Sequence, residues 1–243
     1  MNTKFVKAAL VLTIVALFGS ACGFLPALGS RNLITEARTV SGYDRLSVSG
    51  AGDVTIIQDG TEALTIETDD NVMQYVTTEV KGQTLSIGLD FHGAQQIIPS
   101  KLHVSLHVKD LTEISSSGSW DVVSDSITTN SLAVNTSGSG DVSIKSLTAD
   151  ALTVGISGSA DMEFAGKVGS QQVTISGSGN YHAGDLQTRE TTFTVSGSGD
   201  GTVWVTDSLT AKVSGNGTID YYGSPQVTFN QSGSGDIKAL GDK

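Results

Sequence analysis

The chain has 243 residues, with 25 acidic against 14 basic side chains and a formal net charge of −11. Glycine occurs 29 times and proline only 3 times, which favours ordered β structure with many tight turns over disorder. The acidic balance supplies no basic face for phosphates, so we expect no nucleic-acid partner. A single cysteine excludes an internal disulfide and a cysteine-built metal site, and we expect no cofactor.

Residues 1–21 predict an export signal. Lys4 and Lys7 precede an apolar run over residues 8–18, which is too short to span a bilayer. Small residues then lead directly to Cys22, an order that resembles a bacterial lipoprotein signal. The resemblance implies that Cys22 is the lipid attachment point of an extracytoplasmic protein held to a membrane, and Gly23 after it favours the outer membrane or cell surface. The alternative is an ordinary cleaved signal peptide that leaves one free thiol.

One five-residue motif, Ser-Gly-x-Gly-Asp, organises the rest of the chain. Its spacing from the second copy onward is 20, 20, 19, 20, 18 and 18 residues, which is typical of a solenoid. The eight copies, two of which have Asn or Thr in place of the Asp, begin at Ser49, Ser117, Ser137, Ser157, Ser176, Ser196, Ser214 and Ser232.

Apolar residues alternate with polar ones around each copy, as in Leu152, Val154 and Ile156 before the copy at Ser157. A period of two predicts strands. We therefore expect an all-β fold, a right-handed parallel β-helix with rungs of 18–20 residues and a less regular N-terminal β part.

The predicted organisation has four parts: a signal over 1–21, a tether over 22–39, an irregular β part over 40–115 and regular β-helix repeats over 116–240. Within the irregular part, residues 63–68, 84–89 and 102–108 alternate as strands, residues 71–75 suggest a short helical turn, and residues 81–83 a hairpin turn.

The second motif residue is glycine in every copy, which predicts a corner with a positive φ. These glycines are Gly50, Gly118, Gly138, Gly158, Gly177, Gly197, Gly215 and Gly233. Stacked carboxylates follow at the fifth position, including Asp53, Asp141, Asp200 and Asp236. Because neighbouring carboxylates repel, either a cation bridges them or each caps its own turn. Turn capping is the stronger interpretation, since Asn180 and Thr218 keep a side-chain oxygen but lack the charge that calcium prefers.

Three further patterns bear on possible chemistry. His103 and His107 lie four apart on a predicted strand, about 13 Å from one another, and do not predict a zinc site. The serines occupy turn corners rather than a Gly-x-Ser-x-Gly elbow, and no pair of acids stands apart from the ladder. His92 and His182 have no partner in the sequence, and we expect both to be solvated. Trp204, Tyr221 and Tyr222 are candidates for sugar stacking, although packing in the core or between rungs is the favoured role.

Four features of the chain belong together: the lipoprotein-like start, the segment from Tyr43 to Val54 around the first motif copy, the run Asp69-Asp70-Asn71 and the serial motif copies. In this combination the chain resembles the head-GIN-domain family of autotransporter adhesins. This resemblance covers about 40–243. It implies a bacterial, secreted or lipid-anchored β-helical domain, and it brings no catalytic residues with it.

The sequence thus favours a lipid-anchored, non-catalytic envelope β-solenoid that binds a surface glycan or protein. The alternatives are a carbohydrate-active β-helix enzyme and a structural component of the envelope.

Overall fold

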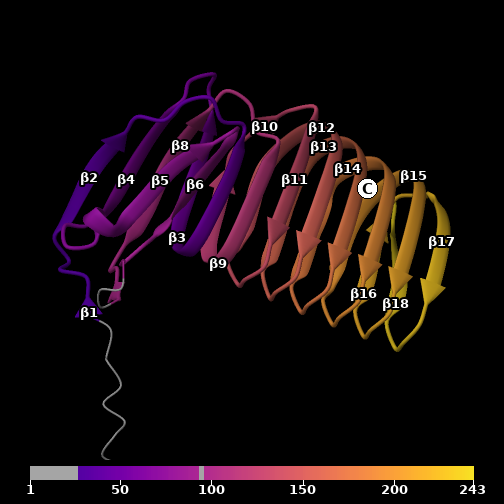
Figure 1. The fold of residues 1–243 in the computed structure, drawn as a ribbon. Helices are drawn as coiled ribbons and strands as arrows, with labels where there is room; N and C mark the ends of the chain where they lie inside the picture. Colours follow the sequence, from indigo (N-terminus) through magenta and orange to yellow (C-terminus); the bar gives the residue numbers. More distant parts are fainter. Residues whose placement is uncertain (1–26, 93–95) are drawn as a thin grey trace, which may run out of the picture.

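A computed structural model describes residues 27–92 and 96–243; the predicted signal and Cys22 lie outside the described residues. Strands stacked side by side form one elongated body that runs from β1 at one end to β17 and β18 at the other (Figure 1). Sixteen strands join in one sheet, and β1 (Ala27–Leu28) pairs separately with β7 (Ile97–Ile98). None of the described helices is long and apolar enough to cross a membrane.

The regular part is a parallel β-solenoid, as predicted. Its strands are β9 (Glu113–Ser124), β10 (Ile127–Thr128), β11 (Ser131–Thr136), β12 (Val142–Ile156), β13 (Asp161–Ile175), β14 (Asn180–Val195), β15 (Gly201–Val213), β16 (Thr218–Tyr222), β17 (Gln226–Gln231) and β18 (Asp236–Gly241). Every pairing among them is parallel, and the motif turns follow the arrowheads of β11 to β15 in Figure 1.

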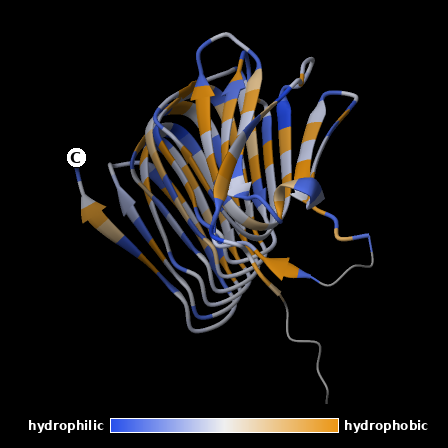
Figure 2. Ribbon diagram, turned by 90° about the vertical axis from the view of Figure 1, so that its left-hand side faces the viewer, coloured by the Kyte–Doolittle hydropathy of each residue, from blue (hydrophilic) through white to orange (hydrophobic). Residues whose placement is uncertain are grey.

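Alternation of apolar and polar residues builds the core. Leu152, Val154 and Ile156 of β12 are each 1% exposed, while the residues between them face outward. In the middle of the core, the ring of Tyr181 lies 5.7 Å from the rings of both Phe164 and Phe193. Figure 2 shows the alternation as bands of opposite hydropathy along the strands. The period-two pattern therefore identified the buried face of each rung.

The less regular part contains β2 (Leu33–Arg38), β3 (Arg45–Gln58), β4 (Ala63–Asp69), β5 (Val76–Lys81), β6 (Thr84–Leu89) and β8 (Leu102–Val108). The three predicted strands of this part are β4, β6 and β8. The predicted hairpin joins β5 to β6, which pair antiparallel, and the predicted helical turn is a 3-10 helix, η1 (Met73–Tyr75). No side chain caps η1.

The predicted tether over residues 22–39 was wrong for its described part, residues 27–39. Here β2 pairs antiparallel with β4, and β1 pairs with β7. The buried carboxylate of Asp69 accepts hydrogen bonds from the backbone N–H of Arg31 at 2.6 Å and of Ser100 at 2.7 Å. Burial alone would raise the pKa of this carboxyl, but hydrogen bonds from Ser100 and Arg31 lower it. These bonds hold the segment to the body.

The boundary predicted between residues 115 and 116 falls inside a strand. β9 crosses it, and β3 stacks on β9 without interruption from Arg45 opposite Glu113 to Ile56 opposite Ser124. The first motif copy therefore lies directly beside the second, although the two copies begin 68 residues apart in sequence. Regular stacking begins at β3, and the irregular strands form an excursion between two neighbouring rungs.

Candidate functional site

The motif glycines stack backbone on backbone. A Cβ on Gly138 would lie 1.7 Å from the carbonyl oxygen of Gly118, and one on Gly158 would lie 1.9 Å from that of Gly138. Each such oxygen also accepts a hydrogen bond from the next rung, as from the Ser139 N–H to Gly118 at 2.8 Å. A side chain at this position would displace a hydrogen-bonded backbone, so glycine is required for close approach.

The expected positive φ was wrong for most copies. Gly50 and Gly118 have φ near 102°, and Gly233 has φ 151°. The other five, which are outside the positive-φ region, are Gly138, Gly158, Gly177, Gly197 and Gly215. For these five the reason for glycine is the neighbouring carbonyl oxygen, 1.7 to 2.1 Å from the position of a Cβ.

The fifth motif position forms a ladder between rungs rather than caps within them. The Asp121 carboxylate accepts the N–H of Asp141 at 2.9 Å, and the Asp141 carboxylate accepts the N–H of Asp161 at 2.8 Å. The series continues through the side chains of Asp161, Asn180 and Asp200 and ends on the N–H of Thr218. Each side chain therefore caps the start of the following strand, which corrects the expected bond to its own turn.

The ends of the motif series differ from its middle. Asp236 bonds the N–H of the next residue, Ile237, at 2.8 Å, and Asp53 lies opposite Asp121 within the continuous pairing of β3 and β9. Across residues 27–92 and 96–243, no cluster of three or more His, Cys, Asp or Glu side chains has the geometry to hold a metal ion. The backbone N–H groups supply the positive partner that stacked carboxylates need.

His103 and His107 alternate with buried residues on β8 and point outward. The Nδ1 atom of His107 lies 2.7 Å from the carboxylate of Asp59. Hydrogen bonds from Thr61 and His107 lower the pKa of Asp59 to about 2. This pair joins the turn after β3 to β8 on the surface, which is a structural contact.

A basin opens where the rungs shorten. The motif step falls from 20 to 18 residues along β14 and β15. Ala183 pairs with Val203 and Gln187 pairs with Trp204, so residues 184–186 of β14 have no partner on β15. The longer rung therefore projects beyond the shorter one, and a step forms on the outer face.

This C-terminal basin, with a volume of about 220 Å³, is lined among others by Glu163, His182, Asp185, Thr202, Tyr222 and Lys243. Glu163 lies opposite His182, and His182 lies opposite Thr202. These three side chains form a polar row across β13, β14 and β15 because equivalent positions of neighbouring parallel strands share a face. Trp204 and Tyr222 are register neighbours, and both rings are half-buried.

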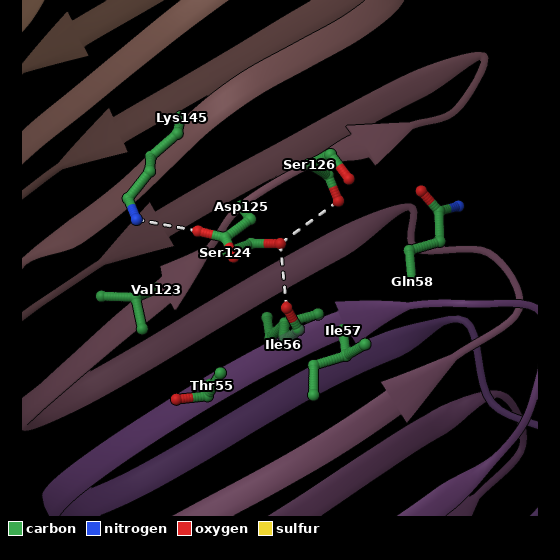
Figure 3. Close-up of a pocket in the computed structure, with 9 residues that line it drawn as sticks. All are labelled: Thr55, Ile56, Ile57, Gln58, Val123, Ser124, Asp125, Ser126 and Lys145. Atoms are coloured by element: carbon green, nitrogen blue, oxygen red, sulfur yellow. Dashed lines mark hydrogen bonds and ion pairs between the residues drawn. The ribbon is translucent and has the colours of Figure 1, made fainter.

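A second groove, about 260 Å³ in volume, lies over β3 and β9 (Figure 3). Ile57 and Val123 line it and are 37% and 45% exposed. Lys145 forms an ion pair with Asp125 at 2.8 Å, and this hydrogen bond raises the pKa of the Lys145 ammonium. The groove therefore combines an apolar floor with a charged rim.

Sequence reasoning did not single out Glu163, Asp185 or Lys243, and it gave His182 no partner. The signal that could have pointed to them is the shortening of the motif step by two residues, because a change in rung length forces a step in a stacked surface. Lys243 reaches the basin through contacts 58 and 59 residues away, which no local pattern encodes.

The fold and its outer grooves define a parallel β-solenoid whose interior is filled by apolar side chains and whose grooves lie on its outer face. Residues 42–225 match the family described as "Putative auto-transporter adhesin, head GIN domain". The chain belongs to this family, as its resemblance predicted. No curated protein matches the chain.

Several solved structures share the fold. A "putative adhesin" from Bacteroides fragilis has a TM-score of 0.83 at 29% identity, covering 88% of this chain and 99% of that one. A "Putative lipid binding protein" from Parabacteroides distasonis has a TM-score of 0.72 at 26% identity, covering 88% and 98%. A "putative adhesin" from the same organism has a TM-score of 0.67 at 23% identity, covering 88% and 99%, and supports the fold alone.

Proposed function

We propose that this protein is a non-catalytic, adhesin-like binding protein of the bacterial envelope, whose outer face takes a surface glycan or a surface protein. The observation that carries the proposal is the placement of its grooves. Apolar side chains fill the interior of the rungs, and the C-terminal basin is a shallow outer depression where half-buried aromatic rings meet polar side chains. Such a surface suits binding to an extended ligand.

The charged groups of the basin are poorly suited to hydrolysis. A glycosidase acid is enclosed by apolar groups, so that its proton is retained until the bond breaks. The Asp185 side chain is instead 79% exposed and paired with Lys243, and Glu163 is exposed. These contacts favour binding over catalysis, and a carbohydrate-active enzyme becomes an outcome of the test below.

We also propose that the protein is held to the membrane by a lipid on Cys22. Leu28 and Ile98, which face one another in the β1–β7 pair, are 68% and 52% exposed and lie at the end of the body nearest Cys22 in sequence. A net charge of −11 opposes adsorption to anionic lipid, so acyl chains would supply the attachment. A related structure named a lipid-binding protein is compatible with this arrangement.

The test is a glycan microarray probed with the purified protein. Each glycan that the protein binds is then incubated with it and analysed by mass spectrometry. The proposal predicts that the protein binds at least one class of envelope or host glycan and leaves the mass of that glycan unchanged. Shortened glycans would establish the enzymatic alternative. Failure to retain any glycan, together with no surface-protein partner by crosslinking on intact cells, would favour the structural alternative.

A further inference from the structure

The ammonium group of Lys243 occupies a seat made of four groups at the edge of the C-terminal basin. Its Nζ donates a hydrogen bond to the carbonyl oxygen of Gly184 at 2.6 Å and another to the Asp185 carboxylate. The same Nζ lies 5.0 Å from the ring centroid of Tyr222 and 5.7 Å from that of Trp204. A carboxylate, a carbonyl and two rings thus converge on one cation.

We propose that this seat, together with the basin beside it, is a binding site for the protonated amino group of an amino sugar, and that Lys243 occupies the seat in place of the ligand. The proposal rests on the proposed binding function and names the ligand class of its basin. Hereafter the four groups of Gly184, Asp185, Trp204 and Tyr222 are called the ammonium seat.

The chemistry of the ammonium seat selects a primary ammonium. Aromatic rings attract cations to their negative faces, and Trp and Tyr do so more strongly than Phe. An ammonium has three donors, and Lys243 uses two of them on Gly184 and Asp185. A neutral hydroxyl or acetamide at this position would gain less from the two rings and the carboxylate.

The backbone creates the seat through the step between rungs. Residues 184–186 have no partner on β15, so the Gly184 carbonyl is available to an incoming donor and the Asp185 side chain lies 79% exposed. A Cβ on Gly184 would lie 3.3 Å from the ring of Tyr222, which shows how closely this backbone approaches the aromatic wall. The Gly184 carbonyl and the Tyr222 ring therefore lie within reach of one and the same ammonium.

Lys243 is a replaceable occupant. It follows the end of β18 at Gly241, and its side chain remains 31% exposed. Because Lys243 belongs to the same chain, its ammonium is present at a high effective concentration beside the seat. It therefore competes with a free ligand and weakens the apparent affinity of that ligand. Removing the Lys243 charge should therefore increase the apparent affinity of the seat for a free ammonium ligand.

The basin beside the seat favours a sugar over a lysine side chain of another protein. Glu163, His182 and Thr202 present a row of hydrogen-bonding groups next to the seat, in a depression of about 220 Å³. Sugar hydroxyls would pair with this row, whereas the methylenes of a lysine would leave it without partners. Exposed carboxylates at Asp161, at the start of β13, and Asp200, directly before β15, add a negative field along the same strands.

The experiment measures binding of a glucosamine oligosaccharide by isothermal titration calorimetry, at a pH that keeps its amino groups protonated. The N-acetylated oligosaccharide of the same length is the matched neutral ligand. Lys243→Ala and Lys243→Gln are both expected to bind the glucosamine oligomer at least about tenfold more tightly than the wild type, and neither should gain affinity for the neutral one. Two variants guard against a folding defect of one, and circular dichroism melts verify both.

Asp185→Asn, made in the Lys243→Gln background, is expected to lose about tenfold of the gained affinity, since the exposed amide keeps the shape but not the charge. Equal binding of both oligomers, no gain on removing the Lys243 charge, or no loss with Asp185→Asn would each overturn the proposal. A lysine-containing peptide that binds the freed seat more tightly than the oligosaccharide would overturn the sugar assignment. If the protein still binds neutral glycans on the microarray in any of these cases, the proposed binding function stands and only the assignment of the ammonium seat is contradicted.

Discussion

The carbonyl oxygen of Gly118 accepts the Ser139 N–H at 2.8 Å while the backbone of Gly138 passes close beside it. At this corner two rungs touch through main chain alone. Gly138→Ala would place a methyl group 1.7 Å from that oxygen, and we expect it to destabilise the protein by at least about 3 kcal/mol, because backbone must move. Urea unfolding measures the change.

The matched control is Ser139→Ala, an exposed position in the same turn, for which we expect a change within about 0.5 kcal/mol. Should Gly138→Ala prove as stable as this control, close approach would not be the reason for glycine.

The Asp ladder makes a separate prediction, because its oxygens accept backbone N–H groups of the following rung. Asp141→Asn keeps the acceptor for the Asp161 N–H and should cost less than about 1 kcal/mol, whereas Asp141→Ala removes it and should cost about 1 kcal/mol more. Thermal melts of both variants measure the difference. Equal losses for Asn and Ala would mean that charge, rather than the acceptor oxygen, is what the ladder needs.

A chelator tests the calcium alternative on the wild type. We expect a change in melting midpoint below about 2 °C, given that 1 kcal/mol shifts a domain of this size by about 2 to 4 °C. A fall of more than about 10 °C would contradict the self-sufficient ladder.

Asp59 carries the clearest pH dependence. Hydrogen bonds from Thr61 and His107 hold its pKa at about 2, against an ordinary value of 3.8. Because the folded-state pKa is the lower one, the stabilisation by this carboxylate is complete above about pH 4 and is lost as the pH falls through about 2. Carbon NMR of the labelled carboxyl should show a midpoint near 2 that rises in His107→Ala. A midpoint near 4 in the wild type would contradict these contacts.

Within the rungs, a buried polar network accompanies the aromatic core. The Tyr181 hydroxyl donates to the side-chain oxygen of Gln171 at 2.7 Å, and Gln171 donates to Thr191 at 3.1 Å. Burial raises the pKa of Tyr181 and keeps it a donor. The network connects β13 with β14 inside the solenoid.

Tyr181→Phe leaves the Gln171 oxygen without its donor, and we expect a loss of about 1 to 3 kcal/mol by urea unfolding. Tyr221→Phe, at a half-buried position of β16, is the matched control with an expected change below about 0.5 kcal/mol. Equal stability of the two variants would show that the hydroxyl of Tyr181 contributes nothing.

Strands and turns were predictable where a local pattern encodes them. Alternation at Leu152, Val154 and Ile156 identified a buried strand face, and residues 81–83 identified a hairpin. The stacking of β3 on β9 was not predictable, because it joins segments whose motif copies begin 68 residues apart and depends on where the intervening strands pack. The basin was missed for the same reason, since Lys243 and Gly184 are 59 residues apart and meet only through the coiling of the rungs between them.

At the scale of the whole molecule, apolar side chains fill the interior of the solenoid, so its outer face is the surface available for function. Its attachment to a membrane is predicted to depend on Cys22. Mass spectrometry of the N-terminal peptide from the membrane fraction should show acyl chains on Cys22, and Cys22→Ser should carry none. An unmodified mature chain that begins at another residue would contradict the anchor.

The central claim is that this solenoid binds a surface ligand without processing it. The most direct measurement is the attachment of intact cells to a glycan-coated surface, comparing cells that carry the wild-type protein with cells that lack it. The account predicts several-fold greater attachment with the protein present and an unchanged mass of the coating glycan. Equal attachment of the two strains, or cleavage of the coating, would contradict it.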